Sequence, residues 1–106
     1  MSRDLSGYVE EFNEEIKSAL SSLSEITSPR AIDSVRYLDA AADAYEDARR
    51  ALHSMESDFF RKRIKETNKD QYNSVRDEMI KSADSTYVLL SRANDKINNA
   101  RQEVPV

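Results

Sequence analysis

Apolar residues recur in the first quarter of the chain at alternating steps of three and four positions. At about 100° per residue they fall within an arc of about 120°, the width of a core-facing stripe on an amphipathic helix. Glutamates occupy the opposite side between positions 10 and 15. The pattern therefore predicts a first helix over about residues 4–26. Its stripe consists of Leu5, Tyr8, Val9, Phe12, Ile16, Ala19, Leu20, Leu23 and Ile26.

Residues 27–30 interrupt this pattern, and a second apolar stripe follows them. Ser28 suits a helix N-cap and Pro29 suits the first helical position, so a second helix is predicted over about residues 29–65. Several stripe positions are alanines, which let neighbouring helices approach closely, and this helix is therefore expected to be central. The stripe consists of Val35, Leu38, Ala41, Ala42, Tyr45, Ala48, Leu52, Met55 and Phe59.

The apolar periodicity fades again between residues 61 and 70, where the charge becomes basic. Asn68 and Gln71 have the spacing of a capping box, so a third helix is predicted from about Lys69 to residue 103, just before Pro105. Short connections between consecutive helices make them antiparallel neighbours. The third stripe consists of Tyr72, Val75, Met79, Ala83, Thr86, Tyr87, Leu90, Ala93, Ile97 and Ala100.

Length and composition agree with an all-α, up-down-up three-helix bundle that occupies residues 1–106 as one domain. The chain has 106 residues, 39% of them hydrophobic, with one glycine and two prolines. A β-sandwich or barrel needs a turn every 8–12 residues or so, which three such residues do not supply. A chain of this length buries roughly 60–70% of its unfolded surface in one core.

Charge and cysteine content exclude several functions. A net charge of −4 and a pI near 5.0 argue against a nucleic-acid module, which needs a dominant basic surface. The apolar runs are far shorter than the roughly 18 residues that span a bilayer, so no membrane insertion by this chain is expected. Without cysteine, neither a disulfide framework nor a thiolate metal site is available.

Candidate catalytic and metal-binding residues are few. His53 is the single histidine, and the position three before it is Arg50 and not the glutamate that a di-metal bundle requires. One glycine and one histidine build neither a phosphate loop nor a nucleophilic triad. We therefore predict no catalytic, cofactor or metal site and no enzyme activity. Carboxylates four positions apart, expected on solvated faces, are Glu10 and Glu14, Glu11 and Glu15, and Asp43 and Asp47.

A basic cluster follows the predicted second helix. It could dock an anionic membrane or an acidic partner, but cations at a helix C-terminus are also favoured by the macrodipole, and that interpretation is preferred. Phe60, Ile64 and Val88 lie off the stripes and are expected outside the main core. The cluster consists of Arg61, Lys62, Arg63, Lys65 and Lys69. The tyrosines, expected in the core or at its edge, are Tyr8, Tyr37, Tyr45, Tyr72 and Tyr87.

The run DARRALHSMESD at positions 47–58 resembles the second helix of the N-terminal domains of Vti1-type SNARE proteins. The shared pattern is an acidic residue followed by Ala, then a Leu, and then Met-Glu with a second acidic residue two positions later. The Tyr8 to Phe12 step resembles the opening of that family's first helix. The Tyr72 to Arg76 step is similar to the start of its third. The resemblance covers residues 5–90 in order and spacing.

The resemblance implies a Habc-type antiparallel three-helix bundle that regulates and recruits in vesicle trafficking between Golgi and endosomes. In that family the domain precedes a Qb-type SNARE motif and a membrane anchor, and ENTH-domain clathrin adaptors recognise it. This chain ends before either element, so we expect an excised N-terminal domain at the cytoplasmic face of Golgi or endosomal membranes. The partner-binding residues stay unknown, because the family has no sharp adaptor motif to carry across.

A second hypothesis is a structural protein that self-associates as a helical bundle or coiled coil, with its apolar stripes shared between chains. The mass in solution distinguishes the two hypotheses. A compact monomer near 12.1 kDa supports a self-contained bundle, and an elongated dimer supports the alternative. A monomer that binds a folded protein through a modest polar contact is the preferred interpretation.

The stripe centres provide a direct test of the predicted helices. Leu52→Ala should lower the free energy of unfolding by roughly 2–5 kcal/mol, because it leaves a cavity in the core. Equilibrium urea unfolding measures this loss. A loss under about 0.5 kcal/mol would place Leu52 on the surface and contradict the predicted face of the second helix. The residues expected to be buried are Phe12, Ile16, Leu38, Tyr45, Leu52, Met79 and Leu90.

Overall fold

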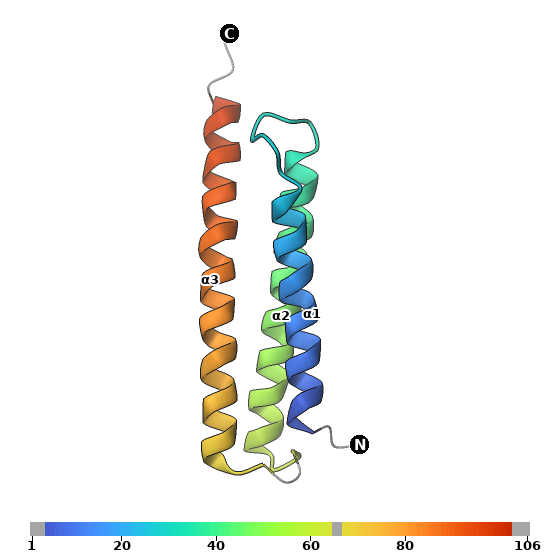
Figure 1. Cartoon of the computed structure of the whole chain (residues 1–106), viewed down its shortest axis with the longest axis vertical. Coiled ribbons are helices and arrows are strands. Elements are labelled where there is room, and N and C mark those ends of the chain that lie inside the picture. The colour runs from blue at the N-terminus through green and yellow to red at the C-terminus, as the bar shows by residue number, and fades with distance from the viewer. Residues whose placement is uncertain (1–3, 65–66, 103–106) are drawn as a thin grey trace.

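The computed structural model describes residues 4–64 and 67–102, and in these ranges it contains three helices and no strand. They are α1 (Leu5–Ser24), α2 (Ser34–Phe60) and α3 (Lys69–Gln102). Figure 1 shows α1 running up, α2 down and α3 up. The molecule is a rod with extents of 61 × 21 × 18 Å. Every pair of helices is in contact. The predicted all-α, antiparallel three-helix bundle is confirmed.

The core is densest between α1 and α2, which pack against each other far more extensively than either packs against α3. Ala41, Ala48 and Ala51 of α2 are buried at this contact or beside it, and their short side chains allow a close approach. Phe12 of α1 and Met55 of α2 are fully buried. The alanine-rich stripe of α2 therefore brings the first two helices together.

The predicted core is largely confirmed. Its members Phe12, Ile16, Leu38, Leu52 and Met79 are buried. Tyr45 and Leu90 are only half-buried, which corrects the prediction. Tyr45 lies at the α2–α3 edge against the ring of Tyr87, with ring centroids 5.8 Å apart, and Leu90 lines a shallow hollow between the same helices. Both miss full burial because α3 packs less closely than α2.

The predicted start of α2 at Pro29 is wrong. The Ala31 N–H donates to the Ser28 carbonyl and the Ser34 N–H to the Ala31 carbonyl, each at 3.1 Å, so residues 28–34 form successive tight turns. The buried Ser34 hydroxyl donates to the Pro29 carbonyl at 3.2 Å and holds these turns against the bundle. Asp33, and not Ser28, is the N-cap residue.

A defined turn ends α2 at Phe60, earlier than the predicted residue 65, which lies outside the described residues. Lys62 has a φ of 57°, in the left-handed region. The Arg63 N–H donates to the Asp58 carbonyl at 2.8 Å and the Lys62 N–H donates to the Phe59 carbonyl at 3.0 Å. These two bonds form a Schellman motif, which satisfies the last carbonyls of the helix.

The predicted start of α3 is confirmed. The Asn68 side chain accepts a hydrogen bond from the Gln71 N–H at 2.8 Å, and the helix begins at Lys69. This bond satisfies one of the free N–H groups of the first turn. The predicted C-terminal limit at residue 103 lies outside the described residues, and α3 is described to Gln102.

The left-handed conformation of Lys62 generates a prediction. Lys62→Gly should raise the free energy of unfolding by about 0.5–1 kcal/mol, because glycine adopts positive φ without the clash of a Cβ. Equilibrium urea unfolding measures the change. Lys81→Gly is the matched control, since Lys81 is exposed inside α3, where glycine should cost about 1 kcal/mol. Destabilisation by both variants would rule out a left-handed residue at position 62.

Candidate partner-binding groove

Residues that carry the family resemblance meet at the end of the bundle where α1 begins and α2 ends. The buried Tyr8 hydroxyl of α1 donates a hydrogen bond to a carboxylate oxygen of Asp58 in α2. Phe12, Leu52 and Met55 are buried in the same core cluster. These side chains hold α1 against α2, so they specify the fold and offer no surface to a partner.

The same region joins α2 to α3. The ring of Tyr72 stacks on that of Phe59, with centroids 3.8 Å apart and planes 3° from parallel. Arg76 donates from Nε to Glu56 at 3.0 Å, a bond that raises the pKa of the guanidinium. Burial, followed by the charge of Glu56, raises the pKa of the Tyr72 hydroxyl above its ordinary value. His53 is exposed and lies 3.9 Å from the other Glu56 oxygen.

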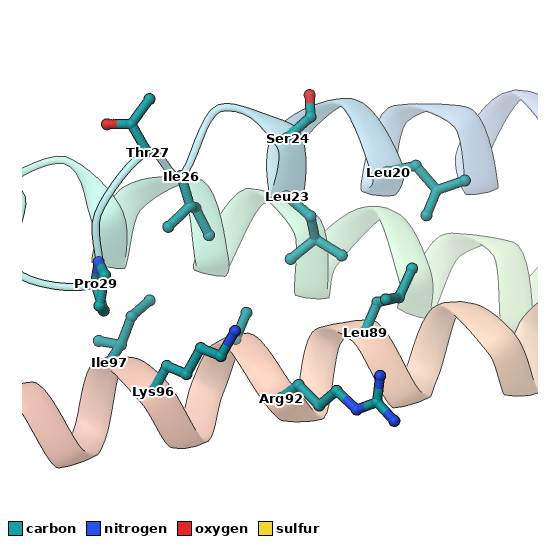
Figure 2. A pocket seen from close by; sticks show the side chains of 11 residues that line it. Leu20, Leu23, Ser24, Ile26, Thr27, Pro29, Leu89, Arg92, Lys96 and Ile97 are labelled. Atoms are coloured by element: carbon teal, nitrogen blue, oxygen red, sulfur yellow. The ribbon is translucent and has the colours of Figure 1, made fainter.

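The other half of the rod has an open groove of about 540 Å³ between α1 and α3. Figure 2 shows Leu20, Leu23 and Ile26 on the α1 side facing Leu89 and Ile97 of α3. Ile97 is buried at the floor, whereas Leu20 and Leu89 are 39% and 46% exposed. The groove thus presents apolar surface to solvent on both sides.

The groove exists because of how α1 ends. The last residue of α1 is Ser24, while α3 continues to Gln102 beside the chain that leaves α1. Ile26, Thr27 and Pro29 of this connection close one end of the hollow. This connection is not helical and packs less closely than a helix would, so the upper part of α3 lacks a full packing neighbour on this side.

One side of the groove carries positive charge. Arg92 and Lys96 lie one helical turn apart on α3, and both are exposed (Figure 2). Among the described residues, neither has an ion-pair partner within 4.0 Å. The 11 residues drawn around the groove include these two cations and no carboxylate. The hollow therefore combines an apolar floor with an uncompensated basic edge.

The candidate residues from the sequence lie elsewhere. Within residues 4–64 and 67–102, no group of three or more His, Asp and Glu side chains is placed to hold a metal ion. The carboxylates of the i,i+4 pairs are exposed except Glu15, which is half-buried. Tyr8 and Tyr72 are buried, Tyr37 and Tyr45 are half-buried, and Tyr87 is mostly exposed.

The three apolar residues that lie off the predicted stripes differ in burial. Phe60 and Val88 are exposed, as expected, but Ile64 is buried in the main core, because the turn after α2 folds it back. In the basic cluster, Arg61, Lys62, Arg63 and Lys69 are exposed, and Lys65 lies outside the described residues.

The stripes did not predict the groove. They placed Leu20 and Ile97 in the core but gave no role to Leu89, Arg92 or Lys96. A signal was present in positions 87–90, YVLL, because four consecutive apolar residues surround a helix and cannot all face one core.

Comparisons with known proteins give no further identification: no family model, no curated protein and no solved structure matches the chain. Across the described ranges, none of the helices is long and apolar enough to cross a bilayer.

The partial exposure of Leu89 predicts a small effect on stability. Leu89→Gln should change the free energy of unfolding by less than about 1 kcal/mol, because glutamine keeps helix propensity and little buried surface is lost. Thermal and urea unfolding of this variant and of Leu52→Ala, measured in parallel, compare the two losses of stability. A loss as large as that of Leu52→Ala would assign Leu89 to the core and remove it from the groove surface.

Proposed function

We propose that this chain works by binding other proteins, as the regulatory and recruiting N-terminal domain of a Vti1-like Qb-SNARE, and that the groove between α1 and α3 is its contact surface. The observation that carries the proposal is the groove itself, with half-exposed Leu20 and Leu89 beside unpaired Arg92 and Lys96. A soluble chain has no structural need to keep apolar and cationic groups together and exposed.

Support for the family comes from where its resembling residues lie. The steps Tyr8 to Phe12 and Tyr72 to Arg76 and the run 47–58 are far apart in sequence, yet they meet in one packed region of an up-down-up bundle. A shared packing scheme is what a common fold requires. By the resemblance, the partner is an ENTH-type trafficking adaptor and the location is the cytoplasmic face of Golgi or endosomal membranes.

A monomer fits this role. The apolar stripes pack against one another within one chain, and Tyr8, Phe12, Met55 and Ile97 are almost fully buried without a second copy. The proposed contact is modest, about 1,200 Å² or less, as in transient signalling complexes. The groove adds an apolar centre to the polar contact expected from the sequence, and Arg92 and Lys96 supply charge complementarity to an acidic partner surface.

The test is a titration of the ¹⁵N-labelled chain with an ENTH-domain adaptor, followed by backbone amide NMR shifts. Shifts should concentrate on residues 20–29 and 89–97. Arg92→Glu with Lys96→Glu should weaken the Kd roughly tenfold, because charge repulsion replaces attraction at the groove edge.

Lys17→Glu with Lys81→Glu is the matched control, since both side chains are exposed outside the groove and the net charge changes equally. This variant should leave the Kd within about twofold. Shifts spread over another face would move the site away from the groove. An absent adaptor response together with tight binding to duplex DNA would overturn the proposed function.

A further inference from the structure

Phe60 is an exposed aromatic residue at the end of the rod opposite the groove. It is the last residue of α2, and 86% of its surface is accessible. Its neighbour Phe59, by contrast, packs against the core and stacks on Tyr72. A single exposed phenylalanine is common on protein surfaces, and what sets Phe60 apart is the charge that follows it in the chain.

Three consecutive cations follow Phe60. Arg61, Lys62 and Arg63 are all exposed, and none has an ion-pair partner among the described residues. We call Phe60, Arg61, Lys62 and Arg63 the basic tip. Asp58, two positions before Phe60, accepts the Tyr8 hydroxyl, and within the described part of the chain no ion pair joins it to these cations. The whole chain has a net charge of −4, so attraction to an anionic surface is confined to local patches such as this one.

The backbone holds the basic tip in place. The Schellman bonds to Asp58 and Phe59 fix the turn, and buried Ile64 anchors its far side in the core. Figure 1 shows that α2 ends and α3 begins at the lower end of the rod. The tip is therefore a built corner of the bundle, with its cations and its aromatic ring on the outside.

We propose that the basic tip is a peripheral docking site for an anionic lipid bilayer. Cations beside such a surface are attracted to its headgroups, and an aromatic ring is stabilised at the headgroup level. A ring that protrudes from a convex end needs a deep, shaped pocket on a protein partner, whereas a bilayer accepts it at any point. The bilayer is the occupant that the exposure of Phe60 favours.

Docking by the tip differs from insertion of a helix. One side chain enters the headgroup region, and the helices stay outside the bilayer. The rod then stands on the surface with the groove between α1 and α3 near its far end, accessible to a protein partner. The inference does not rest on the proposed function, since it uses different residues and a different ligand.

The experiment measures partition of the chain onto sedimented vesicles of phosphatidylcholine, with and without about one third phosphatidylserine. The chain should bind the anionic vesicles and should not bind the neutral ones. Binding to the anionic vesicles should weaken as the salt concentration is raised. Arg61→Gln with Lys62→Gln and Arg63→Gln should reduce the partition coefficient about a hundredfold, because each of the three cations contributes about fivefold. Phe60→Ala should reduce it by roughly fivefold.

Matched controls test the location. Lys17→Gln with Lys81→Gln and Arg101→Gln removes the same charge from exposed positions outside the tip, and Ile32→Ala removes the 97% exposed apolar residue of the α1–α2 connection. Both should keep partition within about twofold. Circular dichroism of every variant verifies that the bundle is folded.

Three outcomes would overturn the proposal. The first is equal partition onto neutral and anionic vesicles, or onto neither. The second is an equal loss with the control variants, which would show that net charge and not the tip determines binding. The third is binding to a polyglutamate peptide that matches vesicle binding and is unchanged by Phe60→Ala, which would identify an acidic protein as the partner.

Discussion

The close approach of α1 and α2 is the contact on which the rest of the structure depends. Buried alanines on α2 remove the bulk that would separate two helices, and Phe12 of α1 is fully buried in the same core cluster as Ala48 and Ala51. At the end where α2 stops, the hydrogen bond from Tyr8 to Asp58 secures the same pair. The third helix then packs on a surface that the first two have already formed.

The looser packing of α3 shapes what the molecule presents to others. α3 is tied to α2 at its start by the Tyr72 stack and the Arg76 to Glu56 ion pair. Further along, α2 still packs on one side of α3, but on the other side α1 ends at Ser24 and a connection without helical structure takes its place. An apolar helix face without a full neighbour leaves Leu89 exposed and forms the groove.

The two proposed surfaces lie at opposite ends of the rod, and they differ in shape and in charge. The groove is concave, with an apolar floor and two cations, and it suits a side chain or helix of a protein partner. The basic tip is convex, with one protruding ring among three cations, and it suits the soft surface of a bilayer. One rod could therefore engage a membrane and a protein at the same time without steric conflict.

The sequence alone determined the number of helices, their faces and the Asn68 cap, because periodicity and capping are local properties that each segment carries itself. It did not place the start of α2, because the turns closed by the Ala31 and Ser34 hydrogen bonds compete with a helix begun at Pro29, and the apolar pattern gives no sign of them. It also overestimated the burial of Tyr45 and Leu90, because a stripe shows which side faces inward but not how closely a neighbour approaches. The groove was likewise decided by tertiary structure, since it lies where α1 ends beside the longer α3. At the end of α2, the left-handed turn at Lys62 accompanies the burial of Ile64 in the core, which the apolar stripes did not indicate.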